Sequence, residues 1–230
     1  MKRIGIIGGV SPQSTEYLYS SIIRFSQNKY NIRAVSEYPN IILESLPIPD
    51  VISSDKNKDQ IESMLLETVK HFELCNVDII GIASSTLHAF LDDIKVQTKI
   101  PFISMVELAA NKCESKKFKK VGLLATPTVI KSKVYNKAFD NKNIELIIPT
   151  EEDIDDIDRA VRGVIAGDYI SEADKEYYSL IIKRMFSMGA QALMLSCIEL
   201  PLTVNYSVLG ERFIILDDLL AEAIVDEYYK

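Results

Sequence analysis

The sequence is poor in the residues that build metal centres and disulfide frameworks. Its 230 residues include three cysteines, Cys75, Cys113 and Cys197, and two histidines, His71 and His88. The cysteines are an odd number without CxxC spacing, which argues against both a disulfide framework and a zinc site. Two histidines are also too few for a histidine-rich metal centre. We therefore expect no metal, no other cofactor, and a protein of the reducing cytoplasm.

Long apolar runs and an excess of positive charge are missing as well. The first apolar run stops at Gly8 and Gly9 after about five residues, too short for the core of a signal peptide. No stretch approaches the roughly 20 apolar residues of a membrane span. The formal net charge is −7, and the longest basic cluster covers only residues 116–120. Because nucleic-acid binding needs a broader basic face, we expect neither a nucleic-acid partner nor a membrane.

What the sequence does contain is a regular alternation of short, β-branched apolar runs with segments of helical period. This alternation is typical of βαβ units around a parallel sheet, so the predicted fold class is α/β. The first helix has a clear start, because Ser11 offers an N-cap and Pro12 follows at the first helical position. Strands are predicted at 4–7, 40–44, 77–82, 102–105, 144–148, 192–195 and 213–216.

The second half of the sequence repeats the plan of the first. Residues 119–126 (KKVGLLAT) echo residues 2–9 (KRIGIIGG), and the register pairs Gly5 with Gly122, 117 positions later. No linker rich in proline or glycine separates the halves. We therefore predict two similar flavodoxin-like subdomains with parallel sheets, pseudo-two-fold related and closely docked.

Four polar loops are predicted to follow strands and to lie where an active site forms in such folds. Binding sites of open parallel sheets lie beyond the carboxyl ends of the strands. The loops cover residues 8–15, 84–88, 126–128 and 196–199, and each places hydroxyl or backbone N–H groups near a helix start. Such groups suit a carboxylate or a phosphate. The first loop matches neither nucleotide-binding glycine motif, and four merely solvated loops remain the simple alternative.

Cys197 is the cysteine that directly follows a buried strand, at a place that matches Ser84, 113 positions earlier. A helix start after the loop would lower the pKa of its thiol, which makes a cysteine reactive. Glu199, two residues on, is placed to take or hold its proton. A Cys-His hydrolase with His88 as the base is a weaker alternative, because His88 lies one helical turn beyond Ser84 and can point into the helix–sheet packing.

Three motifs resemble those of the aspartate/glutamate racemases, in order and over essentially the whole chain. They are GGVSPQST at 8–15, SSTLH at 84–88 and SCIELP at 196–201. The resemblance implies an enzyme without pyridoxal phosphate, in which two cysteines face each other across an amino-acid or small carboxylate substrate. It also implies a homodimer with the active site in the cleft between the halves. The C-terminal helix would pack back, giving subdomains 1–100 plus about 208–230, and 101–207.

The resemblance also assigns roles to residues, with departures from the family pattern. Cys197 would be the acid and base that acts on Cα, with Glu199 beside it, while Ser84 stands where the family has its first cysteine. A serine hydroxyl is a far poorer acid than a thiol, whose reference pKa is about 8.5. The residues expected to bind substrate are Ser11, Gln13, Thr15, Ser85, Thr86, Thr126 and Ile198.

Two further departures concern the substrate. Aspartate-specific members have an arginine after Ile-Pro-Asp and a lysine before an Ala-Gly turn, and here these positions are Val51 and Ile165. An acidic substrate side chain would lose both cationic partners. The leading hypothesis is therefore an amino-acid racemase, with no single amino acid assigned as its substrate. The alternatives are a single-cysteine decarboxylase or isomerase of the same superfamily, and a binding protein without turnover.

The lack of metal-binding patterns makes a first prediction. Dialysis against a chelator should leave any isomerase activity unchanged, and the protein should show no absorbance band of a pyridoxal aldimine. The measurement is the rate of solvent-deuterium entry at Cα before and after chelation. Loss of that rate, with recovery on adding a divalent ion, would contradict the prediction.

Overall fold

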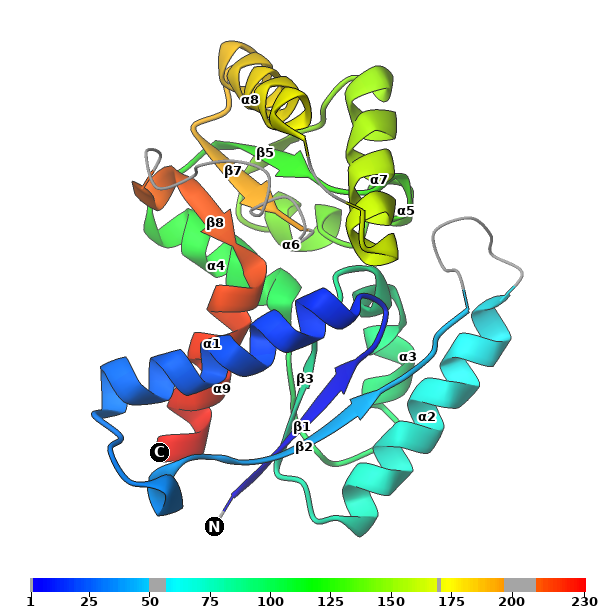
Figure 1. Cartoon of the computed structure of the whole chain (residues 1–230), viewed down its shortest axis with the longest axis vertical. Coiled ribbons are helices and arrows are strands. Elements are labelled where there is room, and N and C mark those ends of the chain that lie inside the picture. The colour runs from blue at the N-terminus through cyan, green and yellow to red at the C-terminus, as the bar shows by residue number, and fades with distance from the viewer. Residues whose placement is uncertain (1, 50–56, 169–170, 197–209) are drawn as a thin grey trace. The chain divides into compact units, whose positions relative to one another are not determined.

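The structure, a computed structural model, describes residues 2–49, 57–168, 171–196 and 210–230. The chain divides into two compact units, unit 1 (Met1–Met105 with Asp217–Lys230) and unit 2 (Val106–Leu216). Each unit holds a four-stranded parallel sheet, in the order β2-β1-β3-β4 and β6-β5-β7-β8 (Figure 1). This 2-1-3-4 order is that of flavodoxin-like winding. The predicted α/β class with two similar parallel-sheet subdomains is confirmed.

Unit 1 is a sheet covered by helices on both faces. Ile7, Ile80 and Ile82 form one apolar cluster with α2, η3 and α3, while α1 and α9 lie on the other face (Figure 1). Burial on both faces explains why these strands read as continuous apolar runs. Its elements are β1 (Arg3–Gly8), α1 (Pro12–Tyr30), the 3-10 helix η1 (Val35–Glu37), β2 (Asn40–Ser45), α2 (Lys58–Leu74), β3 (Ile79–Ile82), the 3-10 helix η3 (Thr86–Phe90), α3 (Leu91–Lys95), β4 (Phe102–Ile103) and α9 (Leu216–Tyr229).

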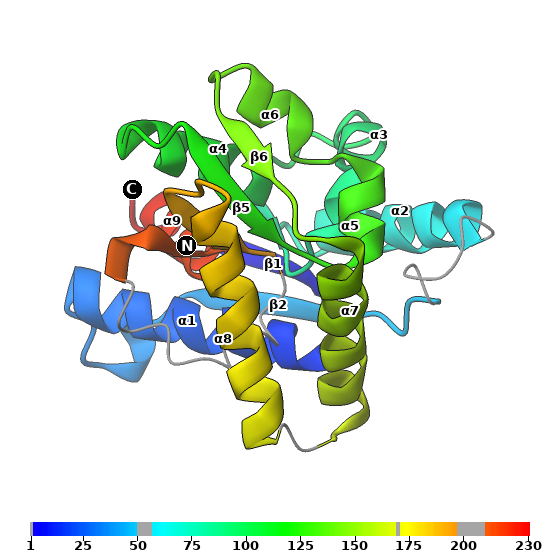
Figure 2. The same cartoon turned by 90° about the horizontal axis from the view of Figure 1, so that it is seen from above.

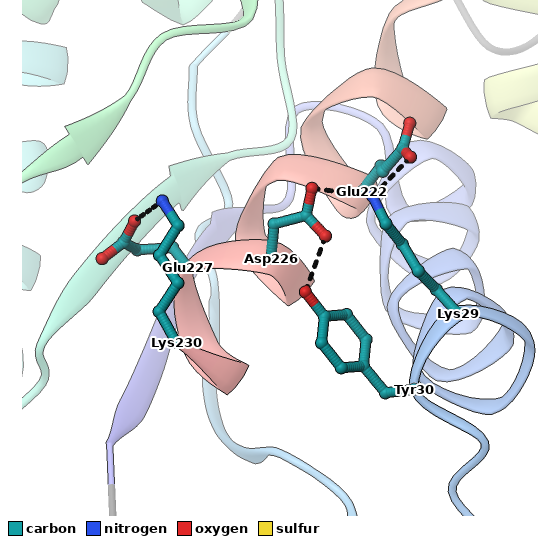
Figure 3. A network of polar contacts seen from close by, with 6 residues as sticks. All are labelled: Lys29, Tyr30, Glu222, Asp226, Glu227 and Lys230. Atoms are coloured by element: carbon teal, nitrogen blue, oxygen red, sulfur yellow. Dashed lines mark hydrogen bonds and ion pairs between the residues drawn. The ribbon is translucent and has the colours of Figure 1, made fainter.

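The C-terminal helix α9 packs over Gly81 of β3 with apolar side chains and is joined to α1 by polar contacts. Its Leu220 and Ile224 are fully buried, and burial of such side chains contributes about 1.5–3 kcal/mol each. Above them, Lys29 Nζ lies 2.8 Å from carboxylate oxygens of both Glu222 and Asp226, and the Tyr30 hydroxyl donates to Asp226 (Figure 3). Exposed ion pairs contribute about 0–1 kcal/mol, so the apolar layer holds α9 and the polar layer fixes its rotation.

Unit 2 repeats the arrangement of helices on both faces of a parallel sheet. Figure 2 shows α7 and α8 on one side of its strands and α4 and α6 on the other. The apolar cluster under α7 and α8 includes Leu124, Ile157, Ile181 and Leu195. Its elements are α4 (Met105–Ser115), β5 (Lys120–Leu124), α5 (Pro127–Ser132), α6 (Asn136–Asp140), β6 (Glu145–Ile147), α7 (Glu151–Ala166), α8 (Glu172–Ser187), β7 (Ala192–Leu195) and β8 (Phe213–Ile215).

The internal repeat extends to individual packing contacts. Gly5 pairs with Ile80 on the neighbouring strand, and Gly122 pairs with Leu193, which reproduces the predicted register. A Cβ at Gly5 would lie 2.7 Å from the Phe72 ring, and one at Gly122 would lie 2.5 Å from Leu193 Cδ2 and 2.7 Å from the end of Met185. Positions 72 and 185 are again 113 apart. In both units a helix therefore packs on its sheet over a glycine of the central strand.

Two predicted strands end earlier than expected. The runs at 102–105 and 213–216 were predicted as strands throughout, but Met105 and Leu216 are the first residues of α4 and α9. Both side chains are buried, and an apolar residue at a strand–helix junction fits either element. Because β4 pairs with β3 and β8 pairs with β7, unit 1 reaches Met105 and unit 2 reaches Leu216.

Within the residues that the structure describes, none of the helices is both long and apolar enough to cross a membrane.

The glycine contacts make a second prediction. Gly5→Ala should destabilise the protein by about 1–3 kcal/mol, because the rigid Phe72 ring must move to admit a methyl group. Gly122→Ala should cost less, under about 1.5 kcal/mol, because the two close atoms, Leu193 Cδ2 and the methyl end of Met185, are ends of flexible side chains that can rotate away. Urea unfolding at equilibrium measures both free energies.

The chain offers a matched control. Gly163 lies inside α7, and a Cβ there would meet its nearest neighbour at 3.5 Å, an ordinary contact. Gly163→Ala should raise the free energy of unfolding by about 0.5–1 kcal/mol, since alanine favours a helix. Equal losses for Gly5→Ala and Gly122→Ala would show that the Phe72 ring is not the limiting contact.

Candidate active site

The loop after β1 is held by its own side chains. The Ser11 hydroxyl accepts from the N–H of Ser14 as the N-cap of α1, as predicted, and donates to Gln13 Oε1. Thr15 Oγ1 accepts from the Gly9 N–H and donates to the Ser11 carbonyl, both at 3.0 Å. Ser11, Gln13 and Thr15 were predicted to bind substrate. Here their polar groups fix the shape of the loop at the carboxyl end of β1.

Two buried residues at this loop were not predicted as site residues. The Ser14 hydroxyl lies 3.3 Å from Asp217 Oδ1 and 3.4 Å from the carbonyl of Ala83, so it bridges the ends of β1 and β3 to the start of α9. Asp217 is 4% exposed and Ser14 is 8% exposed. The sequence signal for Asp217 is its place just after the last predicted strand, where site residues of parallel sheets collect.

The loop after β3 contains the three residues SST. Ser84 is half-buried, and its Oγ accepts from the Leu87 N–H at 3.3 Å. Ser85 and Thr86 are buried at the start of η3, and the Ser85 hydroxyl points to Met105 Sδ at 3.4 Å. The predicted site residues Ser84, Ser85 and Thr86 thus lie together at the carboxyl end of the sheet of unit 1, next to the Ser11–Thr15 loop.

His88 has both ring nitrogens engaged with backbone groups. Nδ1 lies 2.8 Å from the Ser84 carbonyl oxygen, and Nε2 lies 3.1 Å from the Met105 nitrogen. A carbonyl can only accept and an N–H can only donate, so the ring is neutral with its proton on Nδ1. Complete burial lowers the pKa of His88 from 6.5 to about 4, although the bond to Ser84 opposes the shift. No nitrogen is left to act as a base, which removes the support for a Cys-His hydrolase.

In unit 2, Thr126 and Ser196 follow the paired strands β5 and β7. Thr126 precedes α5 and is 3% exposed, and its Oγ1 has no hydrogen-bond partner among the residues that the structure describes. A buried, unpaired hydroxyl costs about 1–3 kcal/mol, so a ligand oxygen that reaches it would be bound favourably. The other predicted residues here, Cys197, Ile198 and Glu199, lie outside the described residues.

The two cysteines that the structure describes both lie in packed positions. Cys113 is buried on α4, and burial raises the pKa of its thiol to about 12. Cys75 is the C-cap residue of α2 and is partly exposed, and it packs against the apolar cluster of unit 1. In the part of the chain that the structure describes, no group of three or more His, Cys, Asp or Glu side chains could hold a metal ion.

Comparison with known proteins identifies the family. Residues 7–211 match the family described as Asp/Glu/Hydantoin racemase. The chain belongs to this family. Membership confirms the resemblance of the three sequence motifs, and the match covers both units except for the first residues, β8 and the C-terminal helix.

Individual members of the family are similar over different lengths. The broad specificity amino-acid racemase RacX of Bacillus subtilis (strain 168) is 25% identical over 144 residues, so the match spans 63% of each chain. Two solved structures are similar over all or nearly all of their length. An aspartate racemase homologue from Pyrococcus horikoshii OT3 has a TM-score of 0.83 and 25% identity over 100% of both chains. Picrophilus torridus aspartate racemase has a TM-score of 0.85 and 25% identity over 100% of this chain and 95% of that one.

The two bonds of His88 make a third prediction, about stability and pH. The folded-state pKa lies below the unfolded value, so the unfolded chain binds the proton first as the pH falls. The stability that the neutral ring contributes is complete above pH 6.5 and is lost as the pH falls towards about 4. Between pH 7.5 and 5 the loss is on the order of 2 kcal/mol.

Urea unfolding of the wild type and of His88→Gln across this range tests the prediction. The difference in the free energy of unfolding between the two proteins should narrow on acidification, because glutamine does not titrate. The carboxylates that also titrate in this range are the same in both proteins, so their effect cancels. A difference that stays constant from pH 7.5 to 5 would mean that His88 is not held neutral in the folded state.

Proposed function

We propose that this chain is a cofactor-independent amino-acid racemase, which removes a proton from Cα and returns one to the opposite face. The proposal is supported by a backbone hydrogen bond that occurs at equivalent strand ends in the two units. The Ala83 N–H donates to the Ile7 carbonyl at 2.8 Å, and the Ser196 N–H donates to the Leu124 carbonyl at 3.0 Å. These are equivalent bonds in the two units, and the next residues along the chain are the two proposed acid–base residues. Two mirror-image substrates need two such groups.

Cys197 is proposed as the competent acid and base. From one enantiomer its thiolate takes the Cα proton, the electron pair of the broken C–H bond moves into the substrate carboxylate, and the opposing Ser84 hydroxyl returns a proton to the other face of Cα. From the mirror-image enantiomer the Cys197 thiol is the group that returns the proton. A thiol is suited to both steps because its reference pKa of about 8.5 lies close to neutral pH. Glu199 is proposed to hold the thiol proton between the steps.

Ser84 is proposed as the opposing, weaker partner. Its Oγ accepts from the Leu87 N–H and, among the described residues, its own hydrogen is donated to no acceptor. That hydrogen is therefore left for a substrate. Because an alkoxide is much harder to form than a thiolate, Ser84 is a competent donor and a poor base. The two directions of racemisation should differ in how readily Cα loses its proton.

Hydroxyl and N–H groups are proposed to bind the substrate carboxylate, on which charge builds up as Cα loses its proton. Preorganised donors are the usual way to stabilise such charge. The unpartnered Thr126 Oγ1 is the strongest described candidate, with the buried groups of Ser85 and Thr86 in unit 1. Ile198 is proposed to contribute its backbone N–H.

The substrate is proposed to be an amino acid without an acidic side chain. Ile165 stands where aspartate-specific members have a lysine, and its side chain packs against the apolar cluster of unit 2. A carboxylate brought to this position would lose its hydration without gaining a cation. The relative RacX is named for broad specificity, which fits a site without that lysine.

The unequal base strength proposed for Cys197 and Ser84 makes a fourth prediction. Solvent deuterium should enter Cα much faster from one enantiomer of a substrate than from the other, while the final mixture stays equimolar. Ser84→Cys should raise the slow rate by roughly 10²-fold or more, the usual contribution of a good general acid or base. Cys197→Ser should abolish exchange from both enantiomers. Proton NMR of both enantiomers of each amino acid measures the rates.

Cys75→Ser is the matched control, since Cys75 lies at the end of α2 and should leave both rates unchanged. The mechanism is wrong if Ser84→Cys changes nothing and Cys197→Ser retains full activity. Release of carbon dioxide from an activated dicarboxylate without exchange of amino acids would favour the single-cysteine decarboxylase instead. Binding of a carboxylate without either reaction would favour a protein that does not turn over.

A further inference from the structure

The backbone around Ser84 is held from both sides by buried side chains. The Ser84 carbonyl accepts from His88 Nδ1 at 2.8 Å, and the preceding carbonyl, of Ala83, lies 3.4 Å from the Ser14 hydroxyl. The Ser84 side chain is fixed in turn by the Leu87 N–H. The direction of the Ser84 hydroxyl is therefore set by its neighbours and not by solvent.

His88 ties this loop to the end of a different strand. Its Nε2 accepts from the N–H of Met105, the first residue of α4 and the second residue after β4. The first N–H groups of a helix have no acceptor within the helix, so the imidazole satisfies one of them. One ring thus bridges the end of β3 to the end of β4.

We propose that His88 is a positioning residue for the proposed racemase reaction, whose neutral imidazole, bonded to the Ser84 carbonyl and the Met105 N–H, aims the Ser84 hydroxyl at Cα. The inference rests on the proposed function, because it assumes that Ser84 is the weaker acid–base group. His88 itself does not touch the substrate. Its effect is confined to the step that needs Ser84.

A histidine that only stabilises the core would affect both enantiomers alike, and the test uses this difference. His88→Leu removes both bonds and keeps a buried side chain of similar size. It should lower deuterium entry from the slow enantiomer by about 10- to 100-fold, since small misplacements of a reacting group cost up to about 10²-fold. Deuterium entry from the fast enantiomer, whose Cα proton is removed by Cys197, should change by less than about 3-fold.

A conservative variant serves as the rescue. The amide of His88→Asn lies where Nδ1 does and can still donate to the Ser84 carbonyl, so it should recover most of the slow rate. His71→Leu is the matched control, because His71 is exposed, pairs with Glu44 on β2, and should change neither rate. If His88→Leu fails to fold by circular dichroism, His88→Gln replaces it. Its amide lies near the position of Nε2, towards Met105 and away from Ser84.

A second readout does not depend on racemase activity. In a Ser84→Cys background, the introduced thiol should react about 5-fold more slowly with iodoacetamide when His88→Leu is added, because the thiolate loses the aligned Leu87 N–H. Peptide mass spectrometry follows the labelling, with His71→Leu again as the control. An unchanged labelling rate overturns the proposal, as does an equal loss of exchange from both enantiomers, or a His88→Asn that behaves like His88→Leu.

The two hypotheses fail in different ways. Absence of exchange in the wild type, together with slower labelling in the His88→Leu background, leaves the positioning role standing and rejects the racemase. Exchange that needs Cys197 but is equally reduced from both enantiomers by His88→Leu leaves the racemase standing and rejects the positioning role.

Discussion

Parallel pairing of the central strand with its neighbour is the interaction on which the rest of each unit depends. In unit 1 the β1–β3 ladder continues one bond beyond the strands, to Ala83, and in unit 2 the β5–β7 ladder continues to Ser196. The position after each of these bonds is fixed in register by all the bonds before it. A slip of one residue would turn every buried side chain of the strand to the opposite face. Core packing therefore fixes the two strand ends that the proposed acid–base residues directly follow.

The loops of unit 1 depend on a second set of bonds, which connect strand ends that are distant in sequence. His88 and Met105 are 17 positions apart, and Ser14 and Asp217 are 203 apart. Both bonds are buried, so breaking one leaves a polar group without water to replace its partner. The polar residues of this site are thus part of the folded core. A substitution of one of them therefore changes the stability of the protein together with the chemistry of the site.

Local chemistry explains what could be predicted from the sequence. The start of α1 at Ser11 and Pro12, and of α8 at Ser171 with Asp174, follow from capping bonds made within a few residues. The repeat of Gly5 in Gly122 was visible because each glycine is needed under a packed helix side chain. The family motifs supplied Ser84, Ser85 and Thr86, and the loop after a repeated strand supplied Thr126.

Tertiary contacts explain what could not be predicted. Nothing in the sequence near His88 indicates that both of its nitrogens meet backbone groups, since one partner begins a later helix. Asp217 was missed because its partner Ser14 lies near the other end of the chain. Such pairings depend on strand order, which periodicity alone does not specify.

The division of unit 1 into two chain segments has a consequence for synthesis. Residues Val106–Leu216 are continuous, whereas the sheet of unit 1 lacks α9 until Asp217–Lys230 have been made. During translation unit 2 can bury its core while the α9 face of β1 and β3 is still open to water. Lys2 Nζ and the Glu227 carbonyl are only 2.6 Å apart, so the last helix returns to the first strand. A gene reordered to start with α9, joined through a short linker to β1, would encode each unit as one uninterrupted stretch and let unit 1 fold first.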